Sequence, residues 1–446
     1  MKKTVFFIIC FSFMICDIIA QNYKIDKQKL SNSVDTAIIN GIEAQAYPGA
    51  QFLLAQNGKI IYSKCYGVHS RLTPLPVKPN DMYDLASVTK STATLLAVMR
   101  LYEQGKIDLN EKVSSYLPFL KNTNKENITI TDLLFHESGL PSSYPFYYSI
   151  IDTNFISKPL LQNFKDSTHQ GKIDNDLFIS NFRYIKGAFS QHKDTTHTLL
   201  VYKDMWLDKK YVDILKNYII KCQYTPKHYQ YSDLGYITLQ WVVESITSRG
   251  LDKYVEEEFY KPMKAYRTMF TPIRKYSENE IIPTVTDDCL RGAKEICGYT
   301  QDEVAAFMGG VAGEAGLFSS ASDLFRIYQM LLNGGELEGK RYFKASTVKL
   351  FTTMRSSISH RGLGFDRPNL KRPNEGPCIA QAPAQCYGHS GFTGPNVWVD
   401  PVNKLVYIFL CNRVSPYPWN NVLNEIGVWG NIQKAIYDSL DRNANL

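Results

Sequence analysis

Beyond its first twenty residues, this chain of 446 residues has no apolar run near the ~18 residues that a membrane-spanning helix needs. It also has no block of lysine and arginine, although its net charge is +7. A positive charge spread this thinly is typical of a soluble surface with mild affinity for anionic polymers, and it does not predict a nucleic-acid partner. We therefore expect neither an integral membrane segment in the processed chain nor a nucleic-acid-binding protein.

Motifs for metal and nucleotide binding are also missing. His136-Glu137 resembles the start of a zinc-protease motif, but no second histidine follows at helical distance. The glycine-rich stretch 308–316 lacks the Gly-Lys-Ser/Thr ending of a phosphate-binding loop, and tight backbone packing is its simpler interpretation. We therefore expect no metal and no cofactor.

Cysteine is scarce, with nine residues in the whole chain. A chain of this length can bury a proper core without disulfides. The close pairs Cys289/Cys297 and Cys378/Cys386 are nevertheless candidates for disulfides in an oxidising compartment, although spacing does not fix their connectivity. Seven cysteines follow the first twenty residues, so at least one thiol is expected to be free.

The N-terminus has the pattern of a secretory signal. Lys2 and Lys3 precede an apolar run over 5–15, and Ala20 provides a small residue for cleavage. We expect residues 1–20 to be removed and residues 21–446 to form one domain. The processed protein is expected to be secreted or periplasmic.

Two strand pairs and two amphipathic helices lie near the opposite ends of the chain. The runs around Asn57-Gly58 predict a hairpin over 51–63, and a second hairpin is predicted over 396–410. Apolar residues at three- and four-residue steps predict helices over 27–44 and 423–440. We expect both hairpins to join one antiparallel sheet, which the two helices cover.

The middle of the chain predicts a second lobe. Helical spacing recurs over about 84–330, so the expected fold class is α/β in the α+β arrangement, with a mostly helical lobe beside the sheet. Residues 144–230 are rich in tyrosine and phenylalanine and have poor periodicity. Because this stretch is too long for a simple connection, it predicts either an inserted subdomain over a cleft or a surface elaboration. The active site is expected between the sheet and the helical lobe.

Ser87 and Lys90 are the first candidate catalytic pair. Ser87 directly precedes a run with helical spacing, so it is expected beside the unpaired N–H groups at a helix start. Lys90 lies three residues later on the same helix face, where its amine can reach the hydroxyl. A serine becomes a nucleophile when a base takes its proton, and a lysine can be that base when its pKa is lowered. An ordinary helix cap followed by a surface lysine is the alternative for this motif alone.

Two later motifs are candidates for the same site. Tyr231-Ser232-Asp233 immediately precedes a predicted helix, where a lone tyrosine is most often a packing residue. His389-Ser390-Gly391-Phe392 opens a late strand, close to the second hairpin. Neither motif is specific by itself.

Together, Ser87-x-x-Lys90, Tyr231-Ser232-Asp233 and His389-Ser390-Gly391 resemble the serine β-lactamase and penicillin-binding-protein superfamily, in its class C-like branch. The order of the motifs and the kind of element that carries each one match that family over essentially the whole processed chain. The phrases around His136-Glu137-Ser138-Gly139 and Ala315-Gly316-Leu317-Phe318-Ser319 also resemble it. The subgroup with the greatest resemblance includes muropeptide amidases and domains fused to β-N-acetylglucosaminidases.

The resemblance implies a role for each residue. Ser87 would attack a carbonyl group, Lys90 and Tyr231 would relay the proton, and the N–H groups of Ser87 and Phe392 would bind the oxyanion. Asp233, His389, Ser390, Gly391 and Phe392 would contact the substrate.

Three residues depart from the family pattern. Asp233 stands where the family has asparagine, and His389 stands where it often has lysine. Glu314 stands where the cell-wall subgroup usually has histidine. An aspartate accepts hydrogen bonds where an amide would donate one, and a histidine is mostly neutral above its usual pKa. These exchanges argue against a true β-lactamase and put the activity of this particular chain in question.

The leading hypothesis is an exported serine hydrolase that acts on amide bonds of peptidoglycan fragments, as a muropeptide amidase or a D-Ala-D-Ala carboxypeptidase. A promiscuous esterase or weak β-lactamase is one alternative. A catalytically inactive protein that binds wall fragments is the other. The expected partner is a small peptidoglycan-derived molecule, and the protein is expected to be a monomer.

Overall fold

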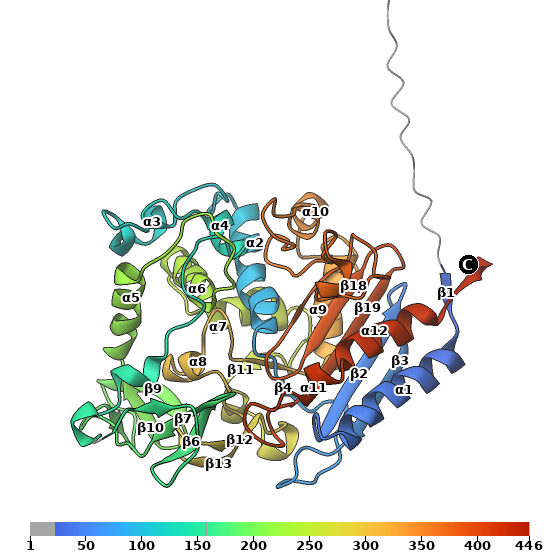
Figure 1. Ribbon diagram of the computed structural model, residues 1–446. Helices are drawn as coiled ribbons and strands as arrows, with labels where there is room; N and C mark the ends of the chain where they lie inside the picture. Colours follow the sequence, from blue (N-terminus) through green and yellow to red (C-terminus); the bar gives the residue numbers. More distant parts are fainter. Residues whose placement is uncertain (1–22, 157, 446) are drawn as a thin grey trace, which may run out of the picture.

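A five-stranded sheet joins the two ends of the chain in the computed structural model, which describes residues 23–156 and 158–445 (Figure 1). The predicted signal, residues 1–20, lies outside this part. The strand order is β17 (Tyr387–Ser390), β18 (Asn396–Asp400), β19 (Leu405–Cys411), β2 (Gly49–Gln56) and β3 (Lys59–Gly67), and all neighbours are antiparallel. The link between the two predicted hairpins is the pairing of β19 with β2, in which Ile408 lies opposite Leu53. The predicted sheet is thus confirmed.

The first hairpin forms where its turn residues predict it. Asn57 and Gly58 both have positive φ angles, of 53° and 76°. A two-residue turn with this geometry matches the right-handed twist of the flanking strands, and asparagine followed by glycine adopts it at little cost. The turn therefore fixes the register of β2 against β3.

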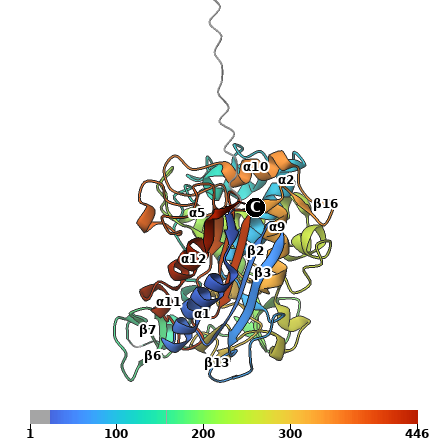
Figure 2. The ribbon, with the colours of Figure 1, turned by 90° about the vertical axis from the view of Figure 1, so that its right-hand side faces the viewer.

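Successive side chains of β2 point to opposite faces of the sheet and so belong to two different cores. Phe52 and Leu54 pack with helix α1 (Lys27–Glu43) and helix α12 (Val428–Asp438) on one face. Leu53 and Ala55 point to the other face and share a core with helix α9 (Ala321–Leu332). Figure 2 shows α1 and α12 together on one side of β2 and β3. The predicted cover by two terminal helices is confirmed, and α9 completes the opposite layer.

The last predicted helix is broken into two. Helix α11 (Val422–Glu425) ends before Gly427, which has a φ of 65°, and α12 begins at Val428. Ile426, which the periodicity placed on the buried stripe, is 40% exposed. The described part ends in strand β20 (Leu440–Asn445), which pairs antiparallel with β1 (Tyr23–Ile25) and so brings its two ends together.

The second lobe is built from short helices around one large core. They are α2 (Leu95–Glu103), α3 (Val113–Tyr116), α4 (Ile130–Leu134), α5 (Tyr211–Lys221), α6 (Asp233–Thr247), α7 (Leu251–Val255), α8 (Glu303–Phe307) and α10 (Ala345–Thr353). Helix α6 is the centre of this lobe, because ten of its fifteen residues, from Leu234 to Val243, are buried.

Two small antiparallel sheets lie within the aromatic-rich stretch 144–230, for which the sequence predicts either an inserted subdomain or a surface elaboration. One small sheet contains β5 (Leu161–Gln162), β6 (His169–Asp174) and β7 (Leu177–Ser180). The other contains β8 (Phe189–Ser190), β9 (His197–Tyr202) and β10 (Met205–Asp208). The strands are short and their register shifts at several points. The sequence therefore shows little of the apolar–polar alternation by which strands are predicted.

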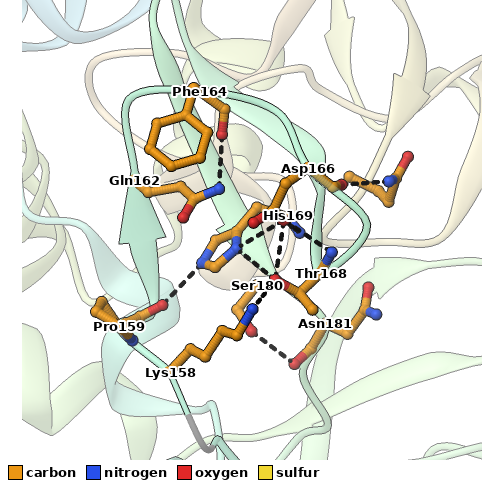
Figure 3. Close-up of polar contacts among 10 residues, drawn as sticks. Lys158, Pro159, Gln162, Phe164, Asp166, Thr168, His169, Ser180 and Asn181 are labelled. Atoms are coloured by element: carbon orange, nitrogen blue, oxygen red, sulfur yellow. Dashed lines mark hydrogen bonds and ion pairs between the residues drawn. The ribbon is translucent and has the colours of Figure 1, made fainter.

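A polar cluster around His169 holds the first of these sheets together (Figure 3). His169 is fully buried, and its Nε2 is 2.9 Å from the carbonyl oxygen of Pro159, while its Nδ1 is 2.9 Å from Thr168 Oγ1. The Asp166 carboxylate accepts hydrogen bonds from the backbone N–H groups of Thr168 and His169, each at 2.8 Å. The stretch therefore has a satisfied polar core of its own.

The seven cysteines of the described part, Cys65, Cys222, Cys289, Cys297, Cys378, Cys386 and Cys411, are free thiols, so neither predicted disulfide is formed. The Cys289 Sγ lies 3.6 Å from the carbonyl oxygen of Lys172, whereas the Cys297 Sγ lies 3.3 Å from that of Ile281. These two thiols thus contact different elements. The Cys386 Sγ is 3.4 Å from the hydroxyl of Tyr437.

No helix within residues 23–156 and 158–445 combines the length and the apolar character that crossing a membrane requires. The same residues contain no group of three or more histidine, cysteine, aspartate or glutamate residues arranged to hold a metal ion.

Candidate active site

Ser87 lies at a sharp turn between strand β4 (Tyr83–Asp84) and a helix. The residue before it, Ala86, has a φ of 44°, a strained conformation for a residue with a side chain. The buried carboxylate of Asp84 holds this turn, since it accepts hydrogen bonds from the N–H of Ala86 at 3.0 Å and from the N–H of Gln301 at 2.6 Å. The turn therefore presents Ser87 at the edge of the lobe, where it lines a cavity of about 370 Å³.

The helix after Ser87 begins with a π-helical turn over Lys90–Thr94 and becomes α-helical at Leu95. The periodicity predicts one continuous helix to Gln104, so this turn is a difference from the expectation. Side-chain hydrogen bonds fix it, including one from Thr94 Oγ1 to the carbonyl oxygen of Gly313 at 2.6 Å. π-helical turns inside helices are frequent at functional sites.

Lys90 is fully buried and contacts three groups at once. Its Nζ donates to Ser87 Oγ at 2.9 Å and to the carbonyl oxygen of Glu314 at 3.1 Å, and it forms an ion pair with Asp233 at 2.7 Å. Burial alone would lower the pKa of the Lys90 ammonium, but the Asp233 carboxylate and the Tyr231 hydroxyl outweigh it and raise that pKa above its usual value. Lys90 is therefore cationic at neutral pH in the free protein.

Tyr231, from the second lobe, lies beside Ser87 and Lys90. It precedes Ser232, which caps helix α6 by accepting a hydrogen bond from the N–H of Gly235 at 3.2 Å. The Lys90 Nζ lies 5.0 Å from the centre of the Tyr231 ring, and this ring stacks on His136 with centroids 4.3 Å apart. Burial raises the pKa of Tyr231 above its usual value, although the charges of Lys90 and Arg361 act in the opposite direction.

Arg361 is a residue of the site that the sequence did not predict. Its guanidinium carbon lies 4.9 Å from the centre of the Tyr231 ring, and its Nη1 forms an ion pair with Asp366 at 2.7 Å. Only 7% of the residue is exposed. Arg361 therefore places a permanent positive charge beside Tyr231, on a loop whose sequence carries no recognisable motif.

His389 is buried on β17 as a neutral imidazole. Its Nδ1 lies 2.7 Å from the carbonyl oxygen of Ser390, so Nδ1 carries the hydrogen, and its Nε2 has no partner among the described residues. Burial lowers the pKa of His389 to about 4, even though Asp366 acts in the opposite direction. His389 thus offers an acceptor to the site, whereas Arg361 provides a cation beside Tyr231.

Gly391 lets the end of β17 approach the turn before Ser87. A Cβ atom at this position would lie 2.4 Å from the carbonyl oxygen of Leu85, so a larger residue would push the two segments apart. Thr393 strengthens the contact, because its hydroxyl donates to the carbonyl oxygen of Asp84 at 2.7 Å. Phe392, the next residue, lines the same cavity as Ser87.

The structure brings together Ser87, Lys90, Tyr231 and Asp233, and it places His389 with its ring centre 6.4 Å from that of Tyr231. Ser390 ends β17 opposite Asn396 and contributes the carbonyl oxygen that orients His389. The segment 144–230 contributes a wall of the cavity, through Tyr144, Pro145, Tyr147, Ile173, Asp174 and Leu177.

Replacing Asp233 with asparagine is expected to change the pH dependence of catalysis. The amide removes the charge that raises the pKa values of both Lys90 and Tyr231, so each can lose its proton at lower pH. The pH at which kcat/KM rises should then be lower by ~1–3 units. The measurement is the pH profile of p-nitrophenyl acetate hydrolysis, with Asp233→Glu as the charge-preserving control. If the unmodified protein and the Asp233→Asn and Asp233→Glu variants have the same pH profile, Asp233 does not control the pKa of the base.

Comparison with known proteins defines the family. The sequence model described as Beta-lactamase matches residues 34–155 and 187–425. The chain therefore belongs to the beta-lactamase family, as its motifs predicted. The internal stretch that the model leaves unmatched, 156–186, includes the sheet of β5, β6 and β7.

Curated relatives match along nearly the whole chain. The N-acetylmuramyl-L-alanine amidase of Bacillus subtilis (strain 168) is 30% identical over 455 residues, which cover 95% of this chain and 91% of the relative. A "Putative D-alanyl-D-alanine carboxypeptidase" of Salmonella schwarzengrund (strain CVM19633) is 31% identical over 448 residues, which cover 93% and 92%. These relationships support the identification of this chain as a hydrolase.

Solved structures share the fold at low sequence identity. EstCE1, a hydrolase with promiscuous acyltransferase activity, has a TM-score of 0.63 at 16% identity and covers 92% of this chain and 99% of its own. A class C beta-lactamase in complex with cefoxitin has a TM-score of 0.62 at 17% identity and covers 93% and 100%. The fold is thus that of class C beta-lactamases and penicillin-binding-protein homologues.

Proposed function

We propose that this protein is an exported serine hydrolase that cleaves amide bonds in peptidoglycan fragments through an acyl-enzyme on Ser87. The close placement of Ser87, Lys90 and Tyr231 carries the proposal. Lys90 Nζ donates to Ser87 Oγ at 2.9 Å and lies 5.0 Å from the centre of the Tyr231 ring, and Ser87 and Tyr231 line the same cavity. Acyl transfer needs such a hydroxyl with a proton acceptor beside it. The names of the two curated relatives support the choice of substrate class. Whether the bond is the lactyl amide or the D-Ala-D-Ala bond stays open.

The proposed reaction begins with the attack of Ser87 Oγ on the amide carbonyl carbon. The hydroxyl proton passes to the Lys90–Tyr231 pair, and the oxyanion is held by the N–H groups of Ser87 and Phe392, each donor being worth about 3–4 kcal/mol. The same pair then gives the proton to the leaving amine, which departs and leaves an ester on Ser87. A water molecule loses a proton to the pair, attacks the ester, and releases the carboxylic acid and the serine.

Charges around the pair decide which group is the base. Lys90 is an ammonium in the free protein, so one proton must leave the pair before Ser87 can be deprotonated. Lys90 and Arg361 together favour the Tyr231 phenolate, whereas Asp233 opposes it. Tyr231 is therefore the proposed acceptor of the serine proton, and Lys90 and Arg361 are its electrostatic support.

Defined muropeptides test the substrate and the bond. The purified protein is incubated with N-acetylmuramyl-pentapeptide that ends in D-Ala-D-Ala, and the products are identified by mass spectrometry. Release of the intact peptide from the sugar is expected of the amidase, and loss of one alanine is expected of the carboxypeptidase. Ser87→Ala is the control and should give neither product. Hydrolysis of p-nitrophenyl acetate without either product would reject the substrate and favour a promiscuous esterase.

A further inference from the structure

His136 follows helix α4 in a backbone conformation that usually belongs to glycine. Its φ is 57°, in the left-handed region. The N–H of His136 donates to the carbonyl oxygen of Leu133 at 3.1 Å, and the N–H of Glu137 donates to that of Asp132 at 2.7 Å. These two bonds define a Schellman motif, whose left-handed residue is most often glycine because a Cβ atom disfavours the conformation. A strained residue at such a position points to a function of its side chain.

The imidazole of His136 is buried against Tyr231. The residue is 2% exposed, and its ring stacks on the Tyr231 ring with centroids 4.3 Å apart and an interplanar angle of 25°. The ring of Tyr236 lies near the same imidazole, with centroids 5.0 Å apart. Aromatic rings attract one another at these separations, so the imidazole helps to fix the plane of the Tyr231 ring.

His136 also holds the chain on both sides of Tyr231. Its carbonyl oxygen accepts a hydrogen bond from the N–H of Gln230 at 2.9 Å, and its Nδ1 accepts one from the N–H of Ser232 at 3.0 Å. Because Nδ1 is the acceptor, the hydrogen of the neutral ring is on Nε2. Burial lowers the pKa of His136 well below its usual value, so Nδ1 remains an acceptor at neutral pH. Three consecutive residues, 230–232, thus contact this one histidine.

Other hydrogen bonds join the same two segments without the imidazole. The Ser232 hydroxyl donates to the carbonyl oxygen of Pro141 at 2.6 Å, and the N–H of Asp233 donates to that of Ser142 at 2.7 Å. Segment 230–233 therefore stays attached to segment 136–142 when the side chain of His136 is removed. The imidazole adds the stacking contact and the bond from Ser232.

We propose that His136 is a positioning residue for Tyr231, which it holds by ring stacking and by hydrogen bonds to the N–H groups of the residues before and after it. The inference rests on the proposed function, in which Tyr231 accepts the serine proton. His136 is not among the described residues that line the cavity, so it acts through Tyr231. The place of the Tyr231 ring decides how near its hydroxyl comes to the Lys90–Ser87 pair, and proton transfer requires hydrogen-bond reach. A displaced ring should slow the chemical step without weakening substrate binding.

Replacing His136 with glycine separates positioning from helix capping. Glycine is the preferred residue at this place in a Schellman motif, so a role limited to ending α4 predicts an unimpaired enzyme. We expect instead that kcat for p-nitrophenyl acetate falls by ~10–100-fold, because a misplacement of about 1 Å can have an effect of this size. KM should change little.

Two further variants calibrate this result. His136→Asn should have a kcat several-fold above that of the glycine variant, because asparagine tolerates the left-handed conformation and its Oδ1 can accept the hydrogen bond from Ser232. Ser248→Gly is the matched control, since exposed Ser248 ends α6 with a φ of 53°. It relieves the same kind of strain away from the site and should leave kcat unchanged. An asparagine variant no better than the glycine variant would contradict the role of the Ser232 bond.

The Tyr231→Phe background shows whether His136 acts through the tyrosine hydroxyl. There, His136→Gly should lower kcat by no more than about twofold, because the group that it positions is already missing. Equal losses in both backgrounds, or a glycine variant as active as the unmodified protein, would overturn the positioning role.

Crystal structures of the unmodified protein and the His136→Gly variant give a test that needs no activity. The variant is expected to have a shifted or a second conformation of the Tyr231 ring, whereas an unmoved, single conformation would overturn the proposal. The expected kinetic pattern with p-nitrophenyl acetate but without muropeptide cleavage would reject the proposed function and keep the positioning role.

Discussion

Replacing Ser87 with alanine is expected to abolish covalent labelling by a fluorescent penicillin or a serine-directed phosphonate. The hydroxyl oxygen is the atom that would form the covalent bond, and Lys90 and Tyr231 act only through it. Turnover of any ester or amide substrate should fall by ~10⁴-fold or more, since the groups of such a site act as a unit. The measurements are gel fluorescence after labelling, mass spectrometry of the labelled peptide, and kcat/KM.

The stability of the Ser87→Ala protein provides the control. Ser87 is half-buried in a turn that Asp84 holds through backbone N–H groups, and those contacts do not involve the serine side chain. The free energy of unfolding should thus change by no more than about 0.5 kcal/mol. A label on a different serine, or equal labelling of the folded variant, would reject Ser87 as the nucleophile.

Replacing Tyr231 with phenylalanine is expected to lower kcat by ~10²–10⁴-fold, the usual cost of losing a general acid–base group. The aromatic ring would still stack on His136 and lie against the Arg361 guanidinium, so KM should change little. The measurement is kcat and KM with p-nitrophenyl acetate over a range of pH.

Tyr229→Phe is the matched control for this variant. Its hydroxyl accepts a hydrogen bond from Arg361 Nε at 3.4 Å, so it contacts the same guanidinium without reaching Ser87. Turnover of the Tyr229 variant should remain within a few-fold of the unmodified protein. A Tyr231→Phe protein that is equally active would remove Tyr231 from the mechanism and leave Lys90 as the sole base.

The sheet could be predicted because its evidence is local. Alternation along 51–63 and 396–410 gives the strands, and Asn57-Gly58 gives the turn. Local patterns do not reveal that β19 pairs with β2. This pairing could be predicted because the apolar stripes of the two terminal helices need one common surface to pack on. The break at Gly427 and the π-helical turn after Ser87 depend on tertiary contacts, which the periodicity does not encode.

The candidate site could be predicted only where residues lie in motifs. Ser87 with Lys90, and Tyr231 with Asp233, are short motifs in which spacing implies proximity. Arg361 contacts the Tyr231 ring, and Asp302 and Glu303 line the cavity, from segments far away in the chain, so no sequence spacing predicts them. The neutral state of His389 likewise follows from burial, which its sequence neighbours do not reveal.

The wall formed by β6 and β7 lies outside the part of the chain that the family's sequence model describes. Ile173, Asp174 and Leu177 line the cavity, yet they fall within 156–186, an internal stretch that the model leaves unmatched. Ser87, Lys90, Tyr231 and Asp233 all come from the matched part, and none is on these strands. One wall of the cavity is thus made of sequence that the family's model does not describe, opposite side chains that it does.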